Sequence, residues 1–160
     1  MNPREAFGSE LRVEAKSTRR MLERVPGESF DWKPHEKSMP LGMIAAHIAN
    51  IPGLFLAPLL QDEFDYNDYQ GLTETLPDLL STFDRNIAAG MEAIGRLSEE
   101  QWSAPWRFRY GGRVIFDHPR LVVVRSTALN HLIHHRGQLS VYLRLLDVPL
   151  PSVYGPTADA

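Results

Sequence analysis

Apolar residues recur every three or four positions in four separate stretches of the chain, the spacing that places them on one face of an α-helix. These stretches cover residues 7–25, 41–51, 76–97 and 119–146. The pair Pro26-Gly27 ends the first stretch, Pro52 limits or kinks the second, and Pro119 suits the opening turn of the last. Four amphipathic helices predict an all-α protein built as an antiparallel four-helix bundle.

The segments between these stretches follow other patterns. Residues 61–75 are acidic and aperiodic, which indicates a loop. Residues 106–119 alternate around Gly111-Gly112, which predicts a short β-hairpin-like insertion before the last helix. The sequence contains no internal repeat or obvious linker, and its 160 residues suit one domain spanning 1–160.

Charge and hydropathy narrow the function classes. The formal net charge of -3 argues against a protein that mainly grips nucleic acid or anionic lipid. The N-terminal segment is charged from residue 4 and lacks the apolar core of a signal peptide. The longest apolar run, residues 43–60, includes His47, Asn50, Pro52 and Pro58, so it indicates a core helix rather than a membrane span. We therefore expect a cytoplasmic protein.

The sequence has no cysteine and six histidines. The missing thiols exclude disulfides, cysteine-ligated metal sites and a cysteine nucleophile, so any metal must be held by histidine and carboxylate. His131 and His135 lie four residues apart on the predicted last helix, and His47 lies on the second. Three neutral imidazoles meeting in the bundle would leave one position of a divalent metal open. A chance pair without metal, or a pairing of His134 with His131, is the alternative that spacing alone leaves open.

Two segments of the chain resemble the DinB/YfiT-like family. Residues 130–159, which contain NHLIHHRGQ, resemble the last helix of that family and its pattern NHxxxHRGQ, and FDWKPHEKSMPLGMIAAHIA resembles its second-helix region. Residues 56–120 carry no motif that matches. The resemblance implies a metal-dependent, homodimeric four-helix protein that binds zinc or nickel through three histidines. Carried over by position, these ligands are His47, His131 and His135.

The buried stripe of the last helix is expected to include both histidines and to continue through polar residues. Gln138 lies three residues after His135 and is a candidate to hold a ligand imidazole by a hydrogen bond, with simple core packing as the alternative. The expected stripe consists of Val124, Ala128, His131, His135, Gln138, Tyr142 and Leu145. Arg136 should point away from the metal, as an ordinary surface or interface arginine or as a charge at a dimer seam or site rim.

Other chemistry-bearing residues receive a structural interpretation first and a functional one second. His35 and His118 are expected to be solvated, with contact at the site rim as the alternative. Trp32 and Pro34 are expected to plug a loop onto the bundle, and Tyr154 is a candidate to reach the site from the tail. The acidic residues are expected to form an ordinary charged loop, with a general base or an extra ligand as their alternative role: Asp62, Glu63, Asp65 and Asp68. The hairpin region carries arginines that suit a dimer contact or a small anion better than nucleic acid: Arg107, Arg109, Arg113, Arg120 and Arg125.

An open three-histidine site supports two reaction classes on a small-molecule substrate. One is hydrolysis by metal-activated water, and the other is transfer of a low-molecular-weight thiol that binds the metal as thiolate. The resemblance favours the second, a thiol-dependent S-transferase, because characterised branches of the family include such enzymes. The alternative is a non-catalytic, stress-related metal-binding or interaction protein. The expected partners are a small molecule and a second copy of the chain, without nucleic acid or membrane.

Overall fold

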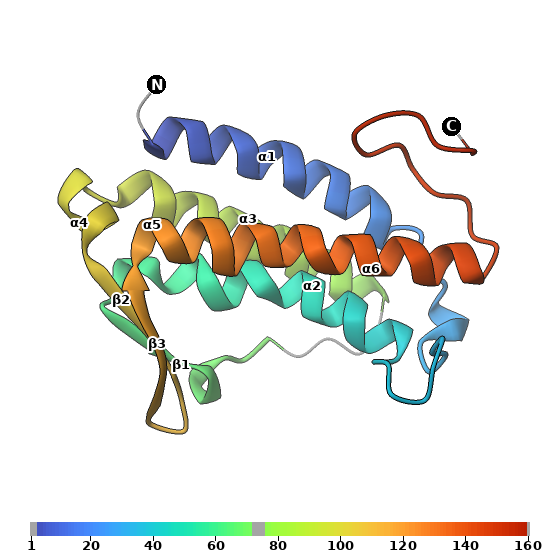
Figure 1. Cartoon of the computed structure of the whole chain (residues 1–160), viewed down its shortest axis with the longest axis horizontal. Coiled ribbons are helices and arrows are strands. Elements are labelled where there is room, and N and C mark those ends of the chain that lie inside the picture. Colours follow the sequence, from blue (N-terminus) through green and yellow to red (C-terminus); the bar gives the residue numbers. More distant parts are fainter. Residues whose placement is uncertain (1–2, 72–75, 160) are drawn as a thin grey trace.

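Four long helices form the body of the protein. The computed structural model describes residues 3–71 and 76–159, so part of the predicted loop, residues 72–75, lies outside the described residues. The helices are α1 (Pro3–Leu22), α2 (Leu41–Phe55), α3 (Leu76–Arg96) and α6 (His131–Leu145). α1 and α6 run antiparallel to α2 and α3 (Figure 1). The predicted four-helix bundle is confirmed.

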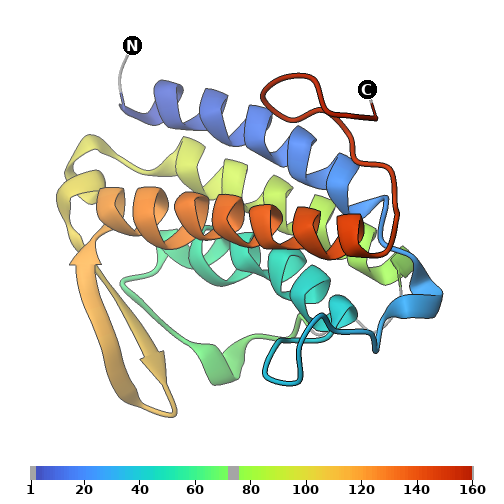
Figure 2. The ribbon, with the colours of Figure 1, turned by 45° about the vertical axis from the view of Figure 1, so that its right-hand side comes forward.

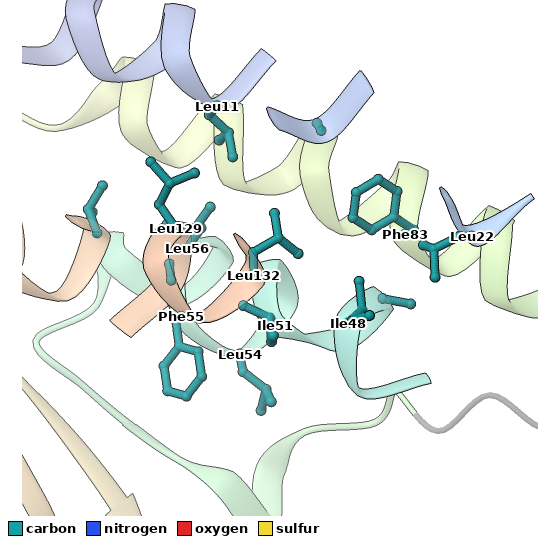
Figure 3. Packing of buried hydrophobic residues seen from close by; sticks show 14 of the residues in the cluster. Leu11, Leu22, Ile48, Ile51, Leu54, Phe55, Leu56, Phe83, Leu129 and Leu132 are labelled. Carbon is teal, nitrogen blue, oxygen red and sulfur yellow. The ribbon is translucent and has the colours of Figure 1, made fainter. Parts of the chain in front are cut away.

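The apolar faces of these helices meet in one core. Leu11 of α1, Ile48 of α2, Phe83 of α3 and Leu132 of α6 are all fully buried and belong to the same cluster (Figure 3). The apolar window within Leu41–Leu60 has a mean hydropathy of 1.7, high enough by composition for a membrane span. Its residues are 72% buried inside the bundle, so core packing accounts for the apolar composition.

The connection from α2 to α3 returns along the bundle, because these two helices run in the same direction (Figure 1). It contains the short helix η2 (Ala57–Leu60), the strand β1 (Glu63–Asp65) and the short helix η3 (Tyr66–Asp68). β1 lies in the stretch that we expected to be a loop, so that expectation is wrong for these residues. A strand of three residues is too short to show an alternating pattern in the sequence.

The predicted hairpin is present and projects from the bundle before the last helix (Figure 2). Its strands β2 (Pro105–Tyr110) and β3 (Arg113–Pro119) pair antiparallel, and β1 pairs parallel to β2. Gly111 and Gly112 both have positive φ, 55° and 77°, as a tight two-residue turn requires. The Asp65 carboxylate accepts hydrogen bonds from both glycine amides and so ties β1 to the turn.

Two shorter helices connect these parts. The 3₁₀-helix η1 (Gly27–Ser29) follows α1, and α4 (Glu99–Ser103) follows α3. Ser98 and Gln101 form a reciprocal capping box at the start of α4, which satisfies two backbone amides there. Trp32 is partly buried and meets Tyr142 edge-on at 5.9 Å between ring centroids, as expected of a loop plug. Pro34 is exposed, so its part in that expectation is wrong.

The last helical segment is not uniformly α-helical. It begins as α5 (Arg120–Val122), continues with π-helical hydrogen bonds in η4 (Val123–Asn130), and becomes α6 at His131. The expected stripe is wrong in its second half, since Gln138 and Leu145 are exposed. The buried line of α6 consists of Leu132, Arg136, Leu139 and Leu143. α6 packs against both α1 and α2, so the histidine line falls at the edge of the core that faces α2.

Candidate metal centre

The imidazole rings of His47, His131 and His135 converge from two helices. His47 lies in the middle of α2, while His131 is the first residue of α6 and His135 follows one turn later. The ring centroids are 4.6 to 4.9 Å apart, and one nitrogen of each ring lies within 4.8 Å of the others. All three side chains are partly buried. The spacing of four residues on α6 therefore brings two imidazoles together with a third from α2.

Each α6 histidine has a hydrogen-bond partner on the side of its ring that faces away from the cluster. The His135 Nδ1 lies 2.6 Å from the Gln138 Oε1, and because an amide oxygen only accepts, the Nδ1 carries the proton. The His131 ring hydrogen-bonds to the backbone of Thr127 inside the π-helical segment η4. Its Nε2 faces the Nε2 of His47 at 3.1 Å. With the His135 Nδ1 protonated, the Nε2 of His135 is the nitrogen that can bind a metal, and the Nε2 of His131 already faces His47 inside the cluster.

The three rings are held in their neutral form. Burial, together with the neighbouring His135 and His131, lowers the pKa of His47 from 6.5 to about 4. Burial is also the largest cause of the lowered pKa of His131 and of His135. Desolvation disfavours a charged imidazolium, and three such cations could not share this space. Neutral imidazole is the form that binds metal, so the site needs little proton release to accept a cation.

The donor set and its spacing fit a divalent transition metal. Two imidazole nitrogens at about 2.0–2.1 Å from a tetrahedral zinc lie about 3.3 Å apart, close to the 3.1 Å between the His47 and His131 nitrogens. Imidazole nitrogen suits zinc, nickel, copper and iron alike, so the residues do not choose among these metals. His47, His131 and His135 are thus a group that can hold a metal ion.

A pocket of about 310 Å³ adjoins the histidine cluster and shares His47 with it. Residues of α2 form one wall, and Met39 and the segment after β1 form the other. Most of the lining is apolar or aromatic, and no carboxylate, lysine or arginine belongs to it among the described residues. The lining residues are Met39, Met43, Ala46, His47, Asn50, Leu54, Tyr66, Tyr69 and Gly71.

Asn50, Tyr69 and Asn86 form a hydrogen-bonded relay at this pocket. The Asn86 Nδ2 donates to the Ala49 carbonyl and to the Tyr69 hydroxyl, both at 2.9 Å. The Tyr69 hydroxyl donates to the Asn50 Oδ1 at 2.7 Å. Burial raises the pKa of Tyr69, so its hydroxyl stays protonated. Sequence reasoning missed this relay, because three polar residues spread over 37 positions show no pattern before the helices pack.

The acidic loop has a structural role in the described structure. Asp62 pairs with the buried Arg120, Glu63 pairs with the hairpin arginines, and Asp65 caps η3 and the hairpin turn. Hydrogen bonds from Asn67, Gly112 and Gly111 lower the pKa of Asp65. None of these carboxylates joins the group of possible metal ligands formed by the histidines. Asp68 is exposed.

Most of the arginines around the hairpin form ion pairs within the protein. Arg107 bridges Asp117 and Glu63, Arg109 pairs with Glu63, and Arg125 pairs with Glu10. Arg113 is exposed at the hairpin turn. Arg120 is fully buried and donates to the carbonyls of Leu59, Gln61 and Pro105. It fastens the connection after α2 to the start of β2, which is a structural role.

Arg136 is only 3% exposed, so the expectation of a surface arginine is wrong. Its guanidinium forms an ion pair with Glu14 at 2.7 Å and hydrogen-bonds to the Thr18 hydroxyl on the same helix. Tyr154 donates to the Glu14 carboxylate at 2.8 Å and accepts from Arg136, so the tail docks here and not at the histidine cluster. One residue after His135, the α6 helix turns this charge toward α1.

The other histidines lie outside the cluster. His35, His118 and His134 are exposed, as expected for His35 and His118. His118 stacks on Phe116 at 5.3 Å, and His35 accepts a hydrogen bond from the Lys37 amide. The His134 ring contacts the His135 ring edge-on at 4.9 Å between centroids and does not belong to the group of possible metal ligands. The pairing of His134 with His131 is therefore not the one that the structure contains.

Comparison with known proteins gives the same fold. The family model of the DinB family matches residues 2–159. No curated protein sequence matches the chain. A solved DinB-like protein from Bacillus cereus superimposes with a TM-score of 0.74 at 21% identity, covering 94% of this chain and 97% of that one. A DinB-like protein from Bacillus subtilis gives a TM-score of 0.74 at 22% identity, covering 92% and 97%. A protein described as a putative member of the DinB family, from Exiguobacterium sibiricum, gives a TM-score of 0.67 at 19% sequence identity. The match covers 99% of this chain and 97% of that one.

Proposed function

Since this chain belongs to the DinB family and brings three neutral histidines together beside a pocket, we propose that it is a metal-dependent enzyme acting on a small molecule. The reaction that fits best is transfer of a low-molecular-weight thiol to an electrophile. The metal is zinc or nickel, held by His47, His131 and His135. The observation that carries the proposal is the convergence of three imidazoles whose pKa values are lowered.

Some residues of the site would hold the metal, and others would bind the substrate. Gln138 and the backbone of Thr127 fix the orientation of the His135 and His131 rings. His47 forms part of the pocket wall, so a molecule in the pocket lies against the metal site. A metal bound there would act as a Lewis acid that lowers the pKa of a thiol or of water.

Thiol transfer suits the residues around the site better than hydrolysis. The pocket wall contains no carboxylate among the described residues, so it offers no carboxylate that would orient a metal-bound water for attack. A thiol loses its proton to solvent when it becomes a thiolate, and it then needs no protein base. Its sulfur forms a bond to the electrophilic carbon while the leaving group departs with the electron pair of the broken bond. The chain contains no cysteine that would compete for the metal or the electrophile.

Metal content tests the first part of the proposal. We expect protein purified without an affinity tag to contain about one equivalent of zinc or nickel per chain, as measured by inductively coupled plasma mass spectrometry. His131→Ala should lose most of it, while His134→Ala, a neighbouring exposed histidine, should keep it. Wild-type protein without metal, even after incubation with zinc or nickel, would contradict the proposal.

Activity tests the second part. We expect conjugation of low-molecular-weight thiols to monobromobimane to depend on the metal and to fall at least tenfold in His47→Ala and His135→Ala. Activity that is indifferent to both substitutions would refute the enzyme proposal. A metal whose fourth position is closed, with no conjugation or hydrolysis of any substrate, would support the alternative of a non-catalytic, stress-related metal-binding protein.

We also propose that the protein is a homodimer located in the cytoplasm. Support for the dimer comes from exposed apolar side chains on α1 and α6, namely Val13, Val141 and Leu145, which are 58–61% exposed. Size-exclusion chromatography with light scattering should give twice the 18.2 kDa mass of one chain. A monomer at micromolar concentration would contradict this part alone.

A further inference from the structure

In the hydrogen-bonded relay of Asn86, Tyr69 and Asn50 beside His47, it is fixed which group donates and which accepts at each step. The Ala49 carbonyl can only accept, so the Asn86 amide nitrogen must face it, and the second proton of that nitrogen goes to the Tyr69 hydroxyl. The hydroxyl proton is then available for Asn50, so the Asn50 oxygen is the atom that Tyr69 contacts. The Ala49 carbonyl thus determines the orientation of the Asn50 side-chain amide through a chain of three hydrogen bonds.

Because the Asn50 oxygen accepts from Tyr69, the Asn50 amide nitrogen is left as a polar group available to a ligand in the pocket. Asn50 is 7% exposed and lines the pocket, and its Nδ2 donates to no acceptor among the residues that the structure describes. The Nδ2 is not one of the fully buried side-chain atoms without a partner, so water in the pocket can accept from it until a ligand supplies the acceptor. Asn50 lies one helical turn from His47 on the same face of α2.

The rest of the pocket restricts the charge and size of such a ligand. Its walls are the methionines Met39 and Met43, together with Leu54 and two tyrosines, and no charged side chain lines it among the described residues. An uncompensated charge would therefore be costly to bury here. The volume of about 310 Å³ is about twice that of a cavity of about 150 Å³ that binds benzene. A group the size of a substituted benzene ring fits.

We propose that this pocket binds the uncharged, apolar part of an electrophilic carbonyl compound, and that the Asn50 amide donates a hydrogen bond to its carbonyl oxygen. The catalytic meaning of this inference rests on the proposed function, because the ligand would be the electrophile of the thiol transfer. The thiol sulfur would form a bond to the carbon next to the carbonyl group, and the leaving group on that carbon would depart with the electron pair of the broken bond. Asn50 then acts as a specificity-determining residue, and Tyr69 is a positioning residue that keeps the Asn50 oxygen turned away from the ligand.

Three probes of nearly equal size test the proposal without the metal. Acetophenone has the carbonyl oxygen, α-methylstyrene replaces it by a methylene group, and benzoate adds a negative charge. Each is titrated into ¹⁵N-labelled, chelator-treated protein, and the affinity is read from amide shifts, including those of the Asn50 side chain. We expect acetophenone to bind about fivefold more tightly than α-methylstyrene, the effect of one neutral hydrogen bond, and benzoate to bind most weakly.

Variants then locate the preference. Asn50→Leu should bind acetophenone and α-methylstyrene equally, and Tyr69→Phe should reduce the preference for acetophenone. Asn130→Leu changes an exposed asparagine outside the pocket and should retain that preference. If Asn50→Leu does not fold, the wild-type comparison and Tyr69→Phe decide. Equal binding of the neutral probes to wild type, tightest binding of benzoate, a preference that survives in Asn50→Leu, or binding of no probe at millimolar concentration would overturn the proposal.

The outcomes for the pocket and for the metal are separate. Protein that prefers acetophenone but takes up no zinc or nickel keeps the pocket inference and loses the proposed metal chemistry. Protein that takes up metal at the three histidines but shows no preference among the probes keeps the metal site and loses the inference about Asn50.

Discussion

The buried ion pair between α1 and α6 permits a quantitative prediction. Arg136 and Glu14 have side-chain exposures of only 4% and 9%, and the carboxylate also accepts from the Tyr154 hydroxyl. Arg136→Met removes the positive charge and keeps much of the apolar volume. The Glu14 carboxylate is then left buried, with a tyrosine hydroxyl as a remaining donor. We expect a large loss of stability, because an unpaired charge in the interior is poorly solvated.

The size of the loss follows from comparable buried pairs. Removing one partner of such a pair destabilises by about 3–5 kcal/mol, whereas replacing both partners by apolar residues is often close to neutral. The free energy of unfolding of Arg136→Met should therefore fall by about 3–5 kcal/mol. For a chain of this length that corresponds to a decrease in Tm of about 6–20 °C. The double variant Glu14→Met with Arg136→Met should recover a substantial part of the loss.

Urea unfolding of metal-free protein, followed by far-ultraviolet circular dichroism at pH 7, measures these differences. Arg96→Met is the matched control, because Arg96 pairs with Glu92 on the surface with exposures of 65% and 69%. That variant should lose less than about 1 kcal/mol. A loss below about 1 kcal/mol in Arg136→Met, or a double variant no more stable than Arg136→Met alone, would refute the reasoning.

Three further predictions concern the site. The metal-free protein should lose stability as the pH falls from 6.5 to about 4, because the unfolded chain binds a proton at His47 that the folded state does not. Urea midpoints across this range measure the loss of stability. In His47→Gln the midpoint should depend less steeply on pH. Gln138→Leu should weaken metal binding about 10- to 100-fold by removing the partner of His135, as chelator competition would show. Gly53→Ala should destabilise by about 1–3 kcal/mol in urea unfolding, because its Cβ would lie 2.6 Å from the Tyr69 hydroxyl.

Controls for these predictions use the same residue types. Gln138→Glu keeps an oxygen acceptor for the histidine and should retain most of the metal affinity, so equal weakening by glutamate and leucine would contradict the hydrogen-bond explanation. Gly137→Ala places a methyl group where no atom lies within 4 Å and should be neutral or stabilising, since alanine favours a helix interior. A pH-independent urea midpoint between pH 7 and 4 would contradict the argument from His47.

The sequence by itself determined the helices and the candidate ligands. The spacing of apolar residues predicted the four long helices, because an amphipathic face repeats at short range and needs no knowledge of its partner. The spacing of His131 and His135 placed both rings on one side of a helix for the same reason. The Gly111-Gly112 turn was also readable, because positive φ at both positions is a local requirement. These features depend on residues within a few positions of one another.

Only the tertiary structure decided which side of the last helix is buried and what its polar residues contact. Arg136 is buried because Glu14, 122 residues earlier, supplies its counter-charge, and no local pattern reveals such a partner. β1 exists because β2 supplies its hydrogen bonds, and the direction of the Asn50 amide depends on Asn86 and a backbone carbonyl. A polar group is stable inside a protein only when a partner meets it there, and packing brings that partner from a distant part of the chain.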